Sequence, residues 1–396
     1  MTLKIYTPGH GLFMDSLIMY GLACALCEQH LKYDVLGSAQ AFEVDVDGAD
    51  VSDVASAIAH TMFKYKERIN EKLSNRLRLI QRDSSRRLTT YLNSMSDEKE
   101  VLKYLSEYLA PGHARSEGRW ASGGQHVWLP FYPHIGKYFT KEFKHESRNY
   151  GVCQLCIALA ALGIYKAAVS VFTLTPRKPP IPTTHVIVLS FEGRVAGDLL
   201  NQIVDCVGGS AFDEKIRRVR EAAQSLPLSV FIQIVLACLT PDLLIRLHKA
   251  EALWRASSAT FEVVKGGVVQ VRGYEDMVVD RYLSSLVHLM LLDEERSKKT
   301  GEPPVDPLER LRKLTERLLR EEEPGKEEPA AVEALYKQVR EQRAPRLRHG
   351  VAIEALYRFL NTRAPSDLYT ASRQVFKALK EGLGREFCKV LACLIR

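Results

Sequence analysis

Long apolar runs are missing from this sequence of 396 residues. A membrane-spanning helix needs roughly 18 or more consecutive apolar residues, and even the stretch 11–27 carries Asp15 and two glycines. The first ten residues, MTLKIYTPGH, also lack the basic-then-apolar layout of a secretion signal. These absences predict a soluble, cytoplasmic protein.

Nucleotide-binding motifs are missing too. The stretch IYTPGHGLFMDSLIMYGLACAL, residues 5–26, has the strand, turn and helix order of a phosphate loop but not its residues. A Walker loop needs Gly-Lys followed by Ser or Thr, and a Rossmann turn needs a small residue where this chain has Met14. What remains is a helix start at Gly9, His10 and Gly11, whose backbone N–H groups we expect to hold one phosphate or carboxylate.

Catalytic spacings are equally scarce. Four histidines lie within residues 113–145 (His113, His126, His134 and His145), but no His-x-x-x-His or His-x-Asp pattern accompanies them. No sequence feature pairs Cys153 with a base. We therefore expect no enzyme activity. A metal-dependent nuclease or hydrolase that uses these histidines stays open as the alternative.

Eight cysteines are present, and four of them form the pairs CALC (Cys24, Cys27) and CQLC (Cys153, Cys156). Two such pairs could supply four thiolates to a structural zinc. Both pairs lie inside apolar helical patterns, which favours buried thiols that pack as small hydrophobic groups. No cofactor is therefore predicted, with zinc at these four cysteines as the alternative. A disulfide would require a hyperthermophilic source.

The length and patterning predict two domains. Residues 1–210 are predicted to form an α+β domain, because strand patterns at 3–7, 39–46, 168–174 and 185–191 alternate with helical patterns at 12–31, 51–80, 97–109 and 151–166. Residues 211–396 are predicted to form a mainly α-helical domain, a helical bundle. Its helices are expected at 213–224, 227–239, 241–257, 275–292, 350–362 and 366–394, with a hairpin turning at Gly266-Gly267 and charged linkers over 293–345.

Basic residues are in excess and unevenly placed. The formal net charge is +7; residues 64–87 hold nine Lys and Arg against three acids, and residues 343–396 hold eleven against four. A predicted helix over 63–88 would place several bases on one face, where they could follow a phosphate backbone without reading sequence. An ordinary solvated face is the alternative. The phosphate-binding candidates are Lys64, Lys72, Arg76, Arg78, Arg82, Arg86 and Arg87.

The stretch 111–150 has little periodicity and many basic and aromatic residues, a combination typical of nucleic-acid binding. A loop pinned to the core by its aromatic side chains is the alternative. Donors for phosphates and base edges are Arg115, Arg119, Gln125, His126, Lys137, Lys141, Lys144 and Arg148. Flat surfaces for stacking are Trp120, Trp128, Phe131, Tyr132 and Tyr138.

Three separated motifs carry a family resemblance: the N-terminal IYTPGHGLFMDSLIMYGLACAL, the central VWLPFYPHIGKYFT, and the following NYGVCQLCIALAALGIYKAA. Over about residues 1–200 the chain resembles the large subunit of archaeal type I-A CRISPR interference complexes. The resemblance implies a subunit that contacts the 5′ handle of a guide RNA, inspects the motif flanking a DNA target, helps open the duplex and recruits a nuclease-helicase. It implies guide RNA, target DNA and the other subunits as partners, and no membrane.

The resemblance also implies roles for individual residues. Base pairing would carry sequence specificity, leaving the protein to hold backbones and read a few base edges. Arg115, Arg119, Gln125 and His126 are then the predicted flank-reading residues. In the C-terminal domain, Arg346, Arg348, Arg358, Arg373, Lys377 and Lys380 would steer the displaced strand. Some relatives carry a zinc site made of two Cys-x-x-Cys pairs, which keeps the zinc alternative open.

Overall fold

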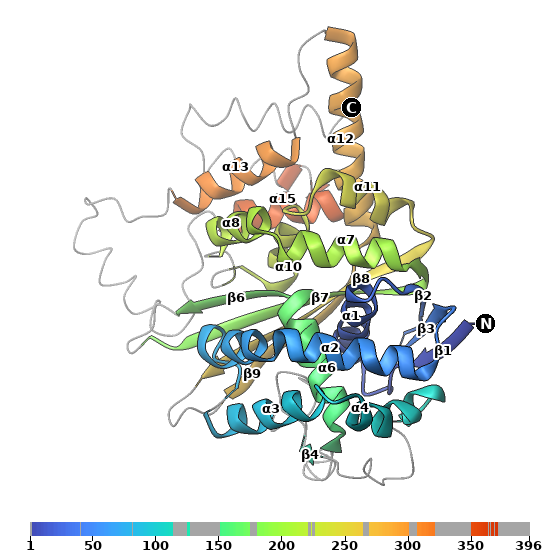
Figure 1. Ribbon diagram of the computed structural model, residues 1–396. Coiled ribbons are helices and arrows are strands. Elements are labelled where there is room, and N and C mark those ends of the chain that lie inside the picture. Colours follow the sequence, from blue (N-terminus) through green and yellow to red (C-terminus); the bar gives the residue numbers. More distant parts are fainter. Residues whose placement is uncertain are drawn as a thin grey trace. The chain divides into compact units, whose positions relative to one another are not determined.

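The computed structural model (Figure 1) divides into two compact units, one formed by Met1–Ser210 with Lys249–Val278 and the other by Ala211–His248 with Val279–Arg396. The sequence-based boundary at 210 is the end of the first segment, but residues 249–278 return to the first unit. The structure describes residues 2–39, 41–80, 82–113, 125–126, 151–174, 180–220, 223, 226–263, 269–300, 307–320, 350–362, 364, 366–367 and 369–370.

The first unit is built on a seven-stranded antiparallel sheet, with the order β1-β3-β2-β7-β8-β9 and β6 pairing with β7. This sheet and its helices confirm the α+β prediction. The strands are β1 (Thr2–Tyr6), β2 (Lys32–Gly37), β3 (Phe42–Asp47), β6 (Val169–Leu174), β7 (Pro182–Ala196), β8 (Ala252–Val263) and β9 (Val269–Val278).

Strand β7 organises the sheet, since it is 15 residues long and three strands pair with it. Its first part, residues 182–187, pairs with β6, and its last part, residues 193–196, pairs with β2. Strand β8 pairs with residues 183–193. The strands predicted at 3–7, 168–174 and 185–191 lie within or beside β1, β6 and β7, whereas β2 had no counterpart in the prediction.

Two apolar helices, α1 (Leu12–Glu28) and α6 (Gln154–Lys166), form the centre of this unit. They approach unusually closely, because a Cβ atom on Gly21 would lie 2.1 Å from the carbonyl oxygen of Leu159, and one on Gly163 would lie 2.1 Å from that of Leu17. Residues 13–26 of α1 and 155–164 of α6 are all buried. The two helices therefore form one buried layer, in which Gly21 and Gly163 allow their backbones to touch.

Further helices surround this pair: α2 (Val51–Asn70), α3 (Arg82–Ser94), α4 (Glu98–Leu105) and α7 (Gly197–Gly208). The start of α2 has a complete capping box, in which Asp50 accepts from the Asp53 N–H and Asp53 accepts from the Asp50 N–H. The π-helical segment η1 (Glu71–Arg76) follows α2, and the 3₁₀ turn η2 (Ser106–Leu109) follows α4.

The described part of the second unit is helical. Its helices are α8 (Ser210–Val219), α10 (Leu228–Leu236), α11 (Pro241–Lys249), α12 (Asp280–Thr300), α13 (Pro307–Arg320) and α15 (Gly350–Thr362). Tyr282 and Tyr357 are fully buried between them, and the Tyr357 hydroxyl lies 3.0 Å from Thr315 Oγ1. The helix predicted at 366–394 lies almost wholly outside the described residues.

Two predicted helices of this half had wrong bounds. The helix expected at 241–257 ends at Lys249 as α11, and residues 252–257 belong to β8; the helix expected at 275–292 begins at Asp280, because 275–278 complete β9. The hairpin strands themselves are confirmed, with their turn outside the described residues. Among the described helices, none is alone both long and apolar enough to cross a membrane; α10 and α11 meet that test only as a pair bent by 107°.

Candidate nucleic-acid interface

The turn before α1 holds an anion that belongs to the chain itself. The backbone N–H groups of Gly9 and Gly11 donate to the two carboxylate oxygens of Asp15, both at 2.8 Å. Burial raises the pKa of Asp15 to about 6, although these hydrogen bonds act in the opposite direction. The predicted phosphate cradle at Gly9, His10 and Gly11 is therefore filled internally, because the His10 N–H also acts on this carboxylate.

The predicted basic helix over 63–88 is interrupted. Helix α2 ends at Asn70, η1 continues to Arg76, and α3 begins only at Arg82. Arg78, between them, has a left-handed backbone with φ of +52°. The Ser85 hydroxyl donates to the Asn70 side chain at 2.9 Å, so α3 begins beside the end of α2. The expected single stripe on one helix face is wrong.

Two of the predicted phosphate-binding lysines have structural partners. Lys72 donates to the carbonyl oxygens of Tyr165, at 2.8 Å, and Ile164, at 3.4 Å, in the last turn of α6. There it satisfies carbonyl groups that the helix leaves unpaired. Lys64 forms an ion pair with Glu28 at 2.5 Å. Lys72 is thus a helix cap, and Lys64 is partly neutralised.

Exposed arginines remain around the junction of α2, η1 and α3. Arg68, Arg78, Arg86 and Arg87 are exposed and form no ion pair with another described residue. Arg76 is 71% exposed and pairs with Glu71 at 3.0 Å. For Arg82 the structure gives the backbone alone, in the first turn of α3. These bases surround a turn and could contact phosphates from several directions.

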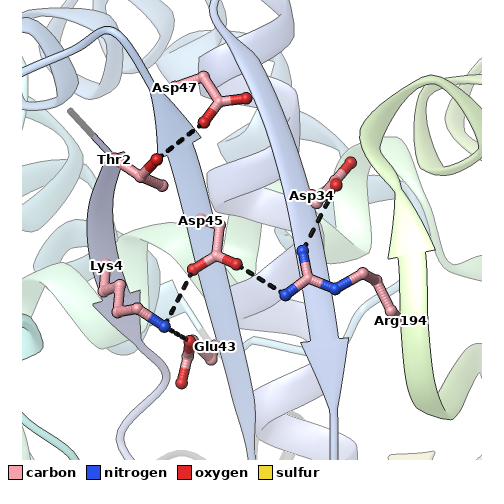
Figure 2. Close-up of polar contacts among 7 residues, drawn as sticks. All are labelled: Thr2, Lys4, Asp34, Glu43, Asp45, Asp47 and Arg194. Atoms are coloured by element: carbon pink, nitrogen blue, oxygen red, sulfur yellow. Dashed lines mark hydrogen bonds and ion pairs between the residues drawn. The ribbon is translucent and has the colours of Figure 1, made fainter.

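The polar face of the sheet has the opposite character. In β3, Phe42, Val44 and Val46 are buried, so the intervening Glu43, Asp45 and Asp47 lie on the other face. Figure 2 shows their partners: Lys4 pairs with Glu43 and Asp45, Arg194 pairs with Asp45 at 3.0 Å and Asp34 at 3.5 Å, and Thr2 donates to Asp47 at 3.1 Å. By the same alternation, exposed Lys32 of β2 also lies on this face, opposite Asp47. Four acids thus meet three bases, and the face offers no excess of positive charge to a phosphate backbone.

Within the stretch 111–150, the structure describes three residues besides Pro111 and Gly112. His113 follows η2, and Gln125 and His126 form β4, which pairs with β5 (Gly151–Val152) in a two-stranded antiparallel sheet. The backbone of Gln125 and His126, two of the four predicted flank-reading residues, is therefore held beside the start of α6. The other predicted residues lie outside the described ones: Arg115, Arg119, Lys137, Lys141, Lys144, Arg148, Trp120, Trp128, Phe131, Tyr132, Tyr138, His134 and His145.

The two cysteine pairs lie at opposite ends of the helix pair. Lys166 and Asp205 are among the charged groups that act on Cys24 and Cys27, and Lys166 is the last residue of α6, whereas Cys153 is its N-cap. A helix of 13 residues is about 20 Å long. A single zinc bound by all four cysteines is therefore wrong on geometric grounds. Cys24 is buried, as expected of a hydrophobic thiol, and burial raises its pKa to about 12.

Cys153 and Cys156 instead meet two histidines. One ligand atom each from His113, Cys153 and Cys156 lies within 4.8 Å of the others, and His10 Nε2 lies 3.3 Å from Cys156 Sγ. Burial opposes ionisation of Cys153, but hydrogen bonds from Cys156 and His113 outweigh it and lower the pKa of Cys153 to about 6. Sequence reasoning missed this cluster, because its members are separated by as many as 146 positions.

Comparison with known proteins decides the family. The profile described as CRISPR-associated protein (Cas_Csa4) matches residues 3–392. The chain belongs to the Cas_Csa4 family. The resemblance to the large subunit of type I-A complexes is thereby confirmed at the level of the family. A protein of Thermoproteus tenax named "CRISPR system associated protein Cas8" is 28% identical over an alignment of 186 residues, which covers 40% of this chain and 50% of that protein.

The Cas_Csa4 match extends through the helical half, where the predicted strand-steering residues lie. Arg358, in α15, is 60% exposed and pairs with Glu354 at 3.3 Å on the same helix. The other five predicted residues, Arg346, Arg348, Arg373, Lys377 and Lys380, lie outside the described part of the chain.

Proposed function

We propose that this chain is a nucleic-acid-binding, non-catalytic large subunit of a type I-A CRISPR surveillance complex, assembled with the other subunits of that complex. It contacts the guide RNA near its 5′ handle and the target DNA, reads the flanking motif and helps recruit the nuclease-helicase. The observation that carries the proposal is the group of exposed arginines at the junction of α2, η1 and α3, in a chain of the Cas_Csa4 family.

Charge and exposure support a backbone-contacting role for this junction. Arg68, Arg78, Arg86 and Arg87 are exposed and have no ion-pair partner among the described residues, so binding phosphates would not require an existing ion pair to break. The face formed by β1, β3 and β2 carries no excess of bases that would attract the same backbone. Nucleic acid is therefore expected at the α2–α3 junction and not at the face formed by β1, β3 and β2.

A role in reading the flanking motif is assigned to Gln125 and His126. Their strand pairing with Val152 and Gly151 anchors the backbone, which fixes the point from which their side chains reach. Amide and imidazole groups can donate to and accept from base edges in a groove, and that is how short sequences are read.

The test uses fluorescence anisotropy with the full chain, in the assembled complex and alone, on duplex DNA, single-stranded DNA and RNA over a range of salt. The variant carries Arg86→Glu and Arg87→Glu, and the control carries Lys99→Glu and Lys103→Glu, which make the same charge change at exposed positions of α4. The variant should bind every sequence more weakly. It should also lower the slope of log affinity against log salt by about two, one unit for each arginine that no longer binds a phosphate.

Equal affinities for the variant and the control would overturn this interface. Failure of the assembled complex to bind any nucleic acid would overturn the proposed function as a whole. Gln125→Ala should change the preference among duplexes that differ only in the flanking bases, with little change in the salt slope.

The non-catalytic part of the proposal has its own test. Labelled RNA and DNA incubated with the chain and magnesium, manganese or zinc should stay intact. Products that disappear in His113→Ala would favour the metal-dependent nuclease or hydrolase instead.

A further inference from the structure

The cluster of His10, His113, Cys153 and Cys156 unites three distant parts of the chain. His10 lies in the turn before α1, His113 follows η2, and the two cysteines lie at the start of α6. The sulfur atoms of Cys153 and Cys156 are 3.3 Å apart. The rings of His10 and His113 have centroids 6.3 Å apart and meet edge to face. Two thiols and two imidazoles thus surround one small volume.

The partners of these side chains match those of metal ligands. Nδ1 of His113 lies 2.5 Å from a carboxylate oxygen of Glu107, which makes Nε2 the nitrogen that would bind a metal. A metal-bound histidine usually donates its second N–H to a carboxylate in this way, which fixes its tautomer and orientation. The Tyr108 hydroxyl donates to Cys156 Sγ at 3.0 Å, and the Cys156 N–H donates to Cys153 Sγ at 3.4 Å. These donors would stabilise thiolates.

Burial argues for a closed structural site. Cys153 and Cys156 have no exposed surface, and His10 is 3% exposed. A nucleophilic cysteine has to meet a substrate, and these sulfur atoms are covered. Two buried thiols could pack without any histidine, so hydrophobic packing alone does not account for two imidazoles and a carboxylate around them. Closed four-ligand sites of nitrogen and sulfur are the ordinary form of structural zinc.

We propose that His10, His113, Cys153 and Cys156 bind one zinc ion in tetrahedral geometry. The contacts of His113, Cys153 and Cys156 already bring three ligand atoms together. His10, in contact with Cys156, completes the set by a small approach toward His113. This ligand set replaces the four-cysteine alternative, and it goes beyond the proposed function, on which it does not depend.

The ion would close the chain at the base of the segment between His113 and Cys153. That segment includes β4, whose pairing with Gly151 and Val152 directly precedes Cys153. Closing a long segment at its base stabilises the fold by restricting the unfolded chain. Zinc would therefore hold β5 in place, and with it the backbone of Gln125 and His126 in β4.

The experiment measures metal bound to the full chain, purified without a metal-affinity step and dialysed against a metal-free buffer, by inductively coupled plasma mass spectrometry. About one zinc per chain is expected. Cys153→Ser and Cys156→Ser should lower the zinc content at least tenfold. The control is Cys206→Ser, a half-buried cysteine of α7 outside the cluster, which should keep its zinc. Replacement of zinc by cobalt should give the absorption bands of a tetrahedral, thiolate-bound ion.

Three results would overturn the proposal: no zinc in the unchanged chain, zinc that persists in Cys153→Ser and Cys156→Ser, or a chain mass two hydrogens lower that shows a Cys153–Cys156 disulfide. Should the serine variants fail to fold, the folded unchanged chain can be titrated with an organomercurial reagent. Zinc release in step with modification of two thiols is then expected. Modification without any zinc release contradicts the site.

Discussion

The Nε2 atom of His10 lies 3.3 Å from the Sγ atom of Cys156, although 146 positions separate the two residues. This contact brings the start of α1 to the start of α6. Because their first turns meet and Gly21 and Gly163 each fit against the other helix, the two buried helices run side by side in the same direction.

Gly163→Ala should destabilise the chain strongly, because the added methyl group would meet the backbone of Leu17 at 2.1 Å and the two helices would have to separate. Overpacking of this kind costs about 1–3 kcal/mol or more in the free energy of unfolding. Gly208→Ala in α7 is the control, since its nearest neighbouring atom is 3.8 Å away. Urea unfolding followed by circular dichroism measures both. Similar stabilities for the two variants would contradict the close packing.

Asp15→Ala should leave two part-buried donors, the N–H groups of Gly9 and Gly11, without their acceptor. Each unpaired group costs about 1–3 kcal/mol, so a loss of roughly 2–5 kcal/mol in unfolding free energy is expected. Asp53→Ala removes the exposed carboxylate that accepts from the Asp50 N–H in the capping box of α2. This change should cost about 0.5–2 kcal/mol. Unfolding titrations compare the two. A smaller loss for Asp15→Ala than for Asp53→Ala would show that the turn does not depend on this carboxylate.

Substitutions of Lys72 and Arg87 should have opposite effects, one on the stability of the fold and the other on affinity for nucleic acid. Lys72→Ala removes donors to the last carbonyl groups of α6 and should lower the unfolding free energy by about 1–2 kcal/mol, with unchanged affinity for nucleic acid. Arg87→Ala should do the reverse, since its side chain is exposed. Thermal unfolding and anisotropy titrations on both variants test this. An affinity loss in Lys72→Ala that equals that of Arg87→Ala would contradict the capping role.

His185 should make stability depend on pH. Burial in β7 lowers its pKa to about 4, from an ordinary value of 6.5. The unfolded chain therefore binds this proton more readily, so the contribution is fully present above pH 6.5 and is lost as pH falls toward 4. The loss amounts to about 3 kcal/mol in unfolding free energy.

His185→Gln removes the titrating group and can still hydrogen-bond toward Thr260, which lies 3.0 Å from Nδ1 of His185. Urea unfolding of both chains at pH 7 and pH 5 gives the difference. The unchanged chain should lose more stability between these values than the variant. Identical losses would show that His185 is protonated in the folded state.

Local sequence patterns predicted the elements whose partners lie nearby. The helix at 350–362 was predicted at its correct bounds, because its signals lie within a few residues. The break after Arg76 also left a trace in the sequence. Leu77, Leu79 and Ile80 are buried and depart from helical spacing, a pattern that the prediction of one continuous helix passed over.

The candidate site depended on contacts that spacing does not encode. The turn around His10 was recognised as an anion cradle, yet its anion is Asp15, which reaches back from the first turn of α1. His113 and Cys153 are brought together by the packing of η2 against the start of α6, and no motif links them. Strand β8 was predicted in part as helix because its alternation was attributed to the end of α11.

Strand β7 limits where the chain can accept an insertion. One residue added between the part that pairs with β6, at 182–187, and the part that pairs with β2, at 193–196, would keep only one neighbour in register. The other would present its opposite side chains to the core, since a shift of one residue exchanges the two faces of a strand. Strand β8, paired across residues 183–193, would meet the same conflict from the other edge. The length of β7 is therefore fixed by three paired strands at once, and an insertion within residues 187–193 would disturb the whole sheet.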